Sequence, residues 1–184
     1  MTPSGLTIVA GMPGCERDLV SLFEAAFTRS EGADEGALIA GLVRDLLHRT
    51  PADEIHVFRA EAGGRVVGAA IFTRLNFPQD DRHAVLLSPF AVAPDRQRRG
   101  IGLALLRHAL AALAARGVDV AMTYGDPAYY AQAGFAPVTG EQVRPPLPLG
   151  APHGWLGQVL AGGGPPTLRG PSVCVPALDR PDIW

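Results

Sequence analysis

The 184-residue chain is long enough for one globular domain, and its 47% hydrophobic residues are enough for an apolar core. A formal net charge of −2 excludes a protein whose whole surface binds nucleic acid or an anionic membrane, and leaves only a local basic patch at residues 96–99. All 16 basic residues are arginine, which excludes a Walker A lysine, a Schiff-base lysine and a lysine general base.

The cysteines and the N-terminus indicate the compartment. Cys15 and Cys174 are the only cysteines and lack C-x-x-C spacing, so no disulfide framework is expected. The first residues, MTPSGLTIVAG, lack the charged start and long apolar core of a secretory signal. The most apolar stretch, LALLRHALAALAA, has 13 residues and is too short to span a bilayer. We expect a cytoplasmic protein with no membrane partner.

The first part of the chain predicts a strand, two helices and a hairpin. Residues 6–10 form a short apolar run typical of a strand. Apolar residues at i, i+3, i+4 and i+7 predict amphipathic helices over 16–27 and 38–47, the second ending before Pro51. The period then changes to two, and residues 55–60 and 65–72 predict strands joined by a turn around residues 62–64.

The middle of the chain alternates strands with helices. Residues 84–93 predict a strand, and Pro89 predicts that it bends or parts from a neighbour near residues 89–91, because proline donates no ladder hydrogen bond. A helix over 103–116 and a strand over 118–124 follow. GDPAYYAQAGF predicts a compact helix with Asp126 as cap, Pro127 in the first position and Gly134 beyond the end.

The C-terminal section has a different composition, since 10 of the 17 prolines lie from Pro137 onward. There, GWLGQVL and SVCV predict a closing hairpin around a GGGPP loop. The predicted order is β-α-α-β-β-β-α-β-α-β-β, an α/β or α+β sandwich with a mixed sheet. We expect one domain over residues 1–184, with a core at 1–137 and a Pro/Gly-rich section at 138–184.

The stretch PDRQRRGIG, residues 94–102, joins a strand to a helix through a glycine-rich turn. Such a turn presents free backbone N–H groups and a helix dipole to phosphate, and Arg98 and Arg99 would add charge. A Walker A loop fails for lack of lysine, and a Rossmann fingerprint would need Gly or Ala in place of Leu105. A solvated basic turn and a nucleic-acid patch remain alternatives, although no aromatic residue interleaves with the arginines.

Two motifs resemble a known family. Gln97-Arg98-Arg99-Gly100-Ile101-Gly102 fits the [QR]-x-x-G-x-[GA] signature of the GNAT superfamily of N-acetyltransferases, and PFAVAPDR resembles that family's fourth strand with its bulge. Tyr130-Ala-Gln-Ala-Gly134-Phe135 is similar to the Y-x-x-x-G-F segment of that family. With GDPAYY before it, the chain most resembles the bacterial YhbS-like branch.

The resemblance implies a fold, a co-substrate and site residues. It implies a mostly antiparallel sheet of six to seven strands flanked by helices, with acetyl-CoA as co-substrate. Strand residues Phe90, Ala91 and Val92 would bind the thioester carbonyl and the pantetheine arm. Tyr130 would be the general acid that protonates the leaving thiolate. The pyrophosphate cradle would consist of Gln97, Arg98, Arg99, Gly100, Ile101 and Gly102.

The expected function is transfer of an acetyl group from acetyl-CoA to a primary amine of a small-molecule or peptide acceptor, by direct attack in a ternary complex. The alternative is a non-catalytic acyl-CoA-binding or regulatory module, because no general base stands out. The acidic loop RSEGADEG indicates either a cationic acceptor or simply a solvated loop. No histidine spacing suits a metal, and we expect no nucleic-acid partner and a monomer or homodimer.

Overall fold

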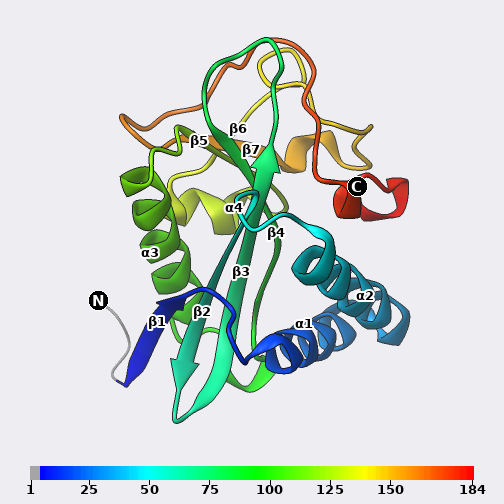
Figure 1. The fold of residues 1–184 in the computed structure, drawn as a ribbon, viewed down its shortest axis with the longest axis vertical. Coiled ribbons are helices and arrows are strands. Elements are labelled where there is room, and N and C mark those ends of the chain that lie inside the picture. The colour runs from blue at the N-terminus through cyan, green and yellow to red at the C-terminus, as the bar shows by residue number, and fades with distance from the viewer. Residues whose placement is uncertain (1–4) are drawn as a thin grey trace. The chain divides into compact units, whose positions relative to one another are not determined.

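The structure, a computed structural model, describes residues 5–184, so the first four residues of the predicted domain lie outside the described residues. Seven strands form one mixed sheet in the order β1-β2-β3-β4-β5-β7-β6, which confirms the predicted fold class (Figure 1). The strands are β1 (Leu6–Ala10), β2 (Ile55–Ala62), β3 (Arg65–Leu75), β4 (Ala84–Val92), β5 (Val120–Tyr124), β6 (Ala136–Pro137) and β7 (Trp155–Val159). The α-helices are α1 (Glu16–Glu31), α2 (Ala33–Arg49), α3 (Ile101–Ala115) and α4 (Pro127–Tyr130).

The chain divides into two compact units whose residues alternate in the sequence. The first contains residues up to Phe72 together with 89–109, and the second contains 73–88 together with 110–184. Two of the three boundaries fall inside strands, one in β3 and one in β4, and the third falls inside helix α3. The single domain expected over 1–184, with its division at residue 137, stays a prediction.

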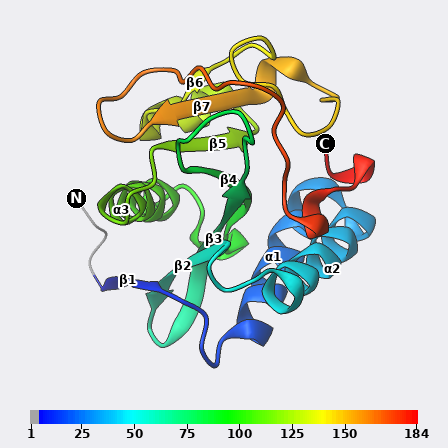
Figure 2. The ribbon, with the colours of Figure 1, turned by 45° about the horizontal axis from the view of Figure 1, so that its top comes forward.

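Helices α1 and α2 of the first unit lie side by side (Figure 2). The predicted stripe of α1 is buried: Leu19, Leu22, Phe23 and Ala26. A glycine lets the two helices approach closely, because a Cβ on Gly36 of α2 would lie 1.9 Å from Thr28 Oγ1 of α1. The acidic loop expected at residues 29–36 is reduced to Gly32, which joins the two helices with a φ of 106°.

The strands of the first unit lead into α3. Strand β1 pairs antiparallel with β2 from Leu6 opposite Ala62 to Ala10 opposite Phe58. Gly68 of β3 faces the start of α3, where a Cβ would lie 3.4 Å from Leu105 and 3.5 Å from Ile101. Just after β4 ends, the backbone N–H of Ala93 donates to the Val67 carbonyl over 2.9 Å. These contacts fix the strand end and the helix start on either side of the glycine-rich loop.

The sheet of the second unit corrects one prediction. Strand β7 pairs antiparallel with both β5 and β6, so GWLGQVL does form a strand but its hairpin partner is Ala136–Pro137. The predicted partner SVCV forms no strand, and only an isolated bridge joins Val173 to Asn76. Pro171 and Pro176 flank this segment and lack N–H donors, which explains why the ladder does not extend.

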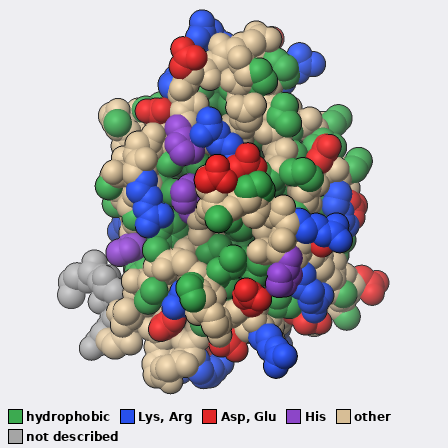
Figure 3. All heavy atoms as spheres, viewed as in Figure 1, with side chains coloured by type: hydrophobic (Ala, Val, Ile, Leu, Met, Phe, Trp, Pro, Cys, Tyr) green, Lys and Arg blue, Asp and Glu red, His purple; other side chains and the backbone are tan. Residues whose placement is uncertain are grey.

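The surface carries charges of both signs. On the face drawn in Figure 3, arginine side chains are interspersed with aspartates and glutamates, as the small net charge predicts. None of the helices within residues 5–184 is long and apolar enough to cross a membrane.

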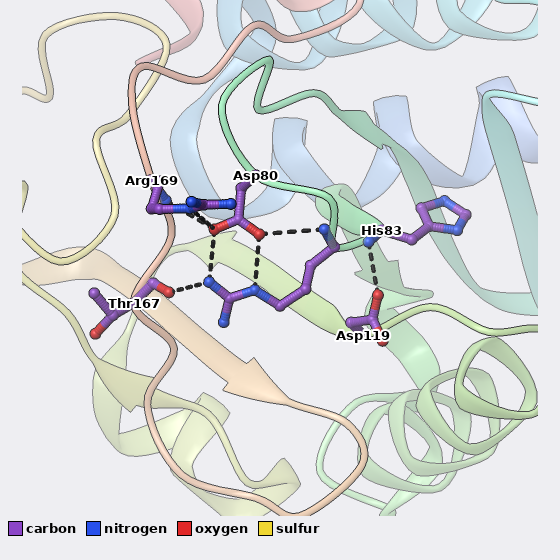
Figure 4. Close-up of polar contacts among 6 residues, drawn as sticks. Asp80, His83, Asp119, Thr167 and Arg169 are labelled. Atoms are coloured by element: carbon purple, nitrogen blue, oxygen red, sulfur yellow. Dashed lines mark hydrogen bonds and ion pairs between the residues drawn. The ribbon is translucent and has the colours of Figure 1, made fainter.

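The Asp80 carboxylate, in the loop between β3 and β4, is hydrogen-bonded to the C-terminal segment of the second unit (Figure 4). The Asp80 side chain is only 4% exposed. It accepts hydrogen bonds from Arg82 Nε over 2.8 Å, from Arg82 Nη2 over 2.7 Å and from the Arg169 backbone N–H over 2.9 Å. Arg82 also donates to the Thr167 carbonyl. Arg82 holds the pKa of Asp80 well below its ordinary range.

Candidate active site

In the loop between β4 and α3, the Gln97 side chain is hydrogen-bonded back to the end of β4. A 3₁₀ turn, Pro94–Arg96, follows the strand, and the Arg96 N–H donates to the Ala93 carbonyl over 2.8 Å. The Gln97 side-chain Nε2 then donates to the Val92 carbonyl over 3.1 Å. The first residue of the predicted cradle is therefore tied by its side chain to the end of the strand.

Arg98 gives this loop an unusual backbone. Among the described residues it is the one non-glycine with a positive φ, 58°, and Gly100 follows with a φ of 75°. Left-handed residues in such a turn direct neighbouring N–H groups into one concavity, the arrangement that binds anions. The first α3 bond runs from Ala104 N to Gly100 O, so the N–H groups of residues 101–103 have no intrahelical partner.

Exposure separates the cradle residues into two groups. Gln97, Arg98, Arg99 and Gly100 are exposed, so their side chains or backbone can meet a ligand from solvent. Ile101 is 5% exposed and its side chain faces Gly68 of β3, which leaves only its backbone for binding. Gly102 is buried as well.

Strand β4 parts from its neighbour β5 before β4 ends, as the sequence predicts. The residues of β4 and β5 pair in parallel from Ala84 opposite Val120 to Leu87 opposite Thr123. Strand β4 continues to Val92, beyond the last of these pairs. Phe90, Ala91 and Val92 therefore lie on the part of β4 that follows this pairing, next to the loop.

Tyr130 ends helix α4 and belongs to the second unit, whereas every predicted cofactor-binding residue belongs to the first. Asp126 caps the helix as predicted, its Oδ1 accepting from the Ala128 N–H over 2.9 Å. The Tyr130 ring meets Phe135 edge-on at 5.7 Å between centroids, and its hydroxyl is hydrogen-bonded to the Thr123 side chain. Burial raises the pKa of Tyr130 to about 12, so the phenol keeps its proton at neutral pH.

Comparison with known proteins decides the family. The model of the acetyltransferase (GNAT) family matches residues 17–135. The uncharacterized N-acetyltransferase YjhQ of Escherichia coli K12 is 33% identical over 140 residues, which cover 73% of this chain and 77% of YjhQ.

The chain belongs to the GNAT family.

Solved GNAT structures share its fold. An acetyltransferase from Brucella melitensis in complex with acetyl-CoA aligns with a TM-score of 0.73 at 24% identity, over 95% of this chain and 98% of its own. YhbS from Escherichia coli in complex with CoA aligns with a TM-score of 0.79 at 22% identity, over 98% of this chain and 96% of its own. As a GNAT member, the chain is an N-acetyltransferase.

Glu61 and His83 are two titratable side chains of a type that can act as a general base. Glu61 forms an ion pair with Arg59 over 2.6 Å. His83 precedes β4, and Tyr130 follows β5; because these strands are parallel, the two residues lie at opposite ends of the pair. Burial lowers the pKa of His83, but its position separates it from Tyr130. Within residues 5–184 no group of three or more histidine, cysteine, aspartate or glutamate side chains could hold a metal.

Sequence reasoning missed Thr123 and Gly125. Thr123 is fully buried in an apolar strand, and Gly125 lies between this strand and α4. A threonine inside the apolar run VAMTY was the available signal, because a buried polar group needs a partner. The bond from Gln97 to Val92 left no signal, since it depends on how the loop turns.

Proposed function

We propose that this GNAT enzyme transfers an acetyl group from acetyl-CoA to a primary amine of a small-molecule or peptide acceptor, by direct attack in a ternary complex. The observation that carries the proposal is the loop of residues 97–102, with left-handed Arg98 and Gly100 before the open N-terminus of α3. A concavity of N–H groups flanked by exposed arginines suits the pyrophosphate of coenzyme A. The acetyl-CoA and CoA complexes of the fold neighbours support the same assignment.

Each predicted residue then has a role that its position supports. The N–H groups of Arg98, Gly100 and Gly102 would bind pyrophosphate oxygens, as would that of Ile101, and the guanidinium groups of Arg98 and Arg99 would neutralise their charge. Gln97 would shape the loop, because its amide is already bonded to Val92. The backbone of residues 90–92 would bind the thioester carbonyl and the pantetheine arm, beyond the paired part of β4.

The reaction forms a C–N bond and breaks a C–S bond. The neutral amine attacks the thioester carbonyl, and the tetrahedral intermediate expels the CoA thiolate, whose thiol has an ordinary pKa near 8.5. Complete proton transfer from Tyr130 to this thiolate is uphill, because the pKa of Tyr130 is raised to about 12. Tyr130 therefore acts by donating a hydrogen bond to the developing thiolate. After the attack the nitrogen is positively charged, and the proton that it releases ends on the CoA thiolate to give the free thiol.

Calorimetric titration with acetyl-CoA tests the cradle. We expect saturable micromolar binding that weakens about tenfold or more in Arg99→Ala, since a charge-assisted contact to phosphate contributes roughly 1.5–3 kcal/mol. Desulfo-CoA should compete, and NAD should not. No heat at millimolar acetyl-CoA would overturn the proposal.

A kinetic comparison separates an enzyme from a module that only binds acyl-CoA. Tyr130→Phe should lower kcat on an amine panel by roughly 10²-fold or more, the range for loss of one hydrogen bond to charge that develops in the transition state, with little change in the Kd of acetyl-CoA. Tight acetyl-CoA binding without transfer to any amine would instead support the regulatory alternative.

A further inference from the structure

The end of strand β5 contains a buried hydroxyl with a defined partner. Thr123 is fully buried, and its Oγ1 donates to the Leu87 carbonyl of β4 over 3.2 Å. Leu87 and Thr123 are also the last residues of the β4–β5 register. The Thr123 hydroxyl has one hydrogen, which rotates about the Cβ–Oγ1 bond and can be donated to one acceptor at a time.

A second acceptor is the Tyr130 phenol oxygen, which is hydrogen-bonded to the Thr123 side chain. This hydrogen bond acts to lower the pKa of Tyr130, so Thr123 is the donor and the phenol oxygen is the acceptor. The bond holds the phenol oxygen at the end of β5 and leaves the phenol hydrogen for the thiolate.

Gly125 makes room for the Tyr130 ring beside this hydrogen bond. A Cβ at residue 125 would lie 2.8 Å from Tyr130 Cε2, closer than two carbons can pack, and 3.7 Å from Cζ, which carries the hydroxyl. The ring cannot easily retreat, because Phe135 and Tyr129 contact it at centroid distances of 5.7 and 5.3 Å. The backbone is held as well, since the Gly125 N–H donates to the Gly154 carbonyl over 2.9 Å.

We propose that Thr123 is a positioning residue for acetyl transfer, which holds the Tyr130 hydroxyl in place while Gly125 leaves space for the ring. This inference rests on the proposed role of Tyr130. As negative charge develops on the phenol oxygen, the Thr123 hydroxyl turns from the Leu87 carbonyl and donates to it. A valine in this position has the same shape but can neither hold the phenol nor donate.

The chain offers a matched control in Thr73. It is also fully buried, but its Oγ1 has no hydrogen-bond partner among the described residues. Thr73→Val therefore removes a hydroxyl without removing a bond, and should leave kcat unchanged. Thr123→Val should lower kcat about five- to tenfold with KM and the Kd of acetyl-CoA unchanged, as expected for one lost hydrogen bond. Thr123→Ser keeps the hydroxyl and should restore most of the rate.

The double variant shows whether Thr123 acts through Tyr130. If it does, Thr123→Val should lower kcat no further in a Tyr130→Phe background. Equal further loss in both backgrounds, or equal effects of Thr123→Val and Thr73→Val, would overturn the inference and leave the proposed function standing. An unaltered rate in Tyr130→Phe alone would overturn the proposed role of Tyr130 and this inference with it.

A spectroscopic measurement needs no activity. In protein labelled with fluorotyrosine, the Tyr130 resonance is the one missing from Tyr130→Phe. It should shift in Thr123→Val and in Gly125→Ala. It should stay in place in Thr73→Val and in Gly41→Ala, because a Cβ on Gly41 would meet nothing within 4 Å. If the Tyr130 resonance shifts in neither Thr123→Val nor Gly125→Ala, the inference is contradicted. This outcome does not depend on whether either variant is active.

Discussion

At the scale of single residues, the most informative feature is the left-handed conformation of Arg98. A side chain in this region strains the backbone, which a molecule tolerates where the conformation serves a site. In this loop the conformation turns N–H groups toward one concavity, and the charged side chain stays exposed. Arg98 thus supplies both a left-handed backbone and a positive charge. A glycine would supply only the first, and an arginine in an ordinary conformation only the second.

Substitution of Arg98 by glycine separates these roles. Relief of strain should outweigh the added entropy of the unfolded chain, and raise the free energy of unfolding by about 0.5 kcal/mol. The affinity for acetyl-CoA should nevertheless fall, because the charge is gone. Arg99→Gly, at a residue without a positive φ, should instead lower stability by about 1 kcal/mol. Urea unfolding measures the free energy of unfolding, and calorimetry measures the affinity for acetyl-CoA. A lower free energy of unfolding in Arg98→Gly would show that the Arg98 backbone is not strained.

The raised pKa of Tyr130 predicts a pH profile. In the proposed mechanism activity requires the protonated phenol of Tyr130, whose pKa is about 12. A tyrosine with the ordinary pKa near 10 would already be half ionised at about pH 10. We therefore expect kcat, measured at saturating substrates, to show no descending limb between about pH 8 and 10. A fall by half near pH 10, with circular dichroism unchanged, would contradict this expectation.

At the scale of elements, Asp80 joins two segments that are far apart in sequence. Its carboxylate is stabilised by Arg82 and by the Arg169 backbone, so its pKa is lower in the folded chain than in the unfolded one. Its contribution to stability is complete above about pH 4 and is lost as pH falls further. We expect Asp80→Asn to lower the free energy of unfolding by about 2 kcal/mol at pH 7.

The experiment includes its own internal control. The difference in free energy of unfolding between the wild type and Asp80→Asn should shrink as the pH is lowered from 7 toward 3. A difference that is the same at both pH values would show that the Asp80 charge contributes nothing to stability. Asp182→Asn provides the comparison for an exposed carboxylate, which should change stability little at any pH.

Periodicity predicted nearly every element but not every pairing. The buried stripes of α1 and α3, the hairpin turn at residues 62–64 and the cap of α4 all follow from local patterns. The last strands did not, because β6 has only two residues and its identity depends on its partner β7. Neither did the hydrogen bond from the Arg169 N–H to Asp80, because it joins residues 89 positions apart.

The residues of the candidate site likewise divide into those that short motifs predict and those that only the structure reveals. The cradle residues 97–102 and Tyr130 could be named from short motifs, since backbone conformation and side-chain chemistry there are local. The left-handed φ of Arg98 and the bond from Gln97 to Val92 needed coordinates. Thr123 needed them too, because only tertiary packing brings its hydroxyl to Tyr130.

At the scale of the whole molecule, the balance of charge predicts what the enzyme does not bind. Arginines and carboxylates alternate over the face in Figure 3, and Asp95 lies 3.5 Å from the Arg96 guanidinium within the basic loop itself. We expect no retention on a short DNA duplex at about 0.15 M salt, where nonspecific phosphate contacts are largely screened. Acetyl-CoA binding should persist at that salt. Tight, steeply salt-dependent duplex binding would revive the nucleic-acid alternative.

The strand order β5-β7-β6 also constrains how the chain can be made. On the ribosome, β6 emerges before β7, yet β7 is the strand that pairs with both β5 and β6. Until about residue 159 has left the exit tunnel, β5 has an open edge and β6 has no described ladder partner. A nascent chain arrested before that point exposes unpaired strand edges, the feature that recruits chaperones and favours aggregation. The length of time spent at this stage of synthesis, and not the stability of the finished fold, would then limit the yield of active enzyme.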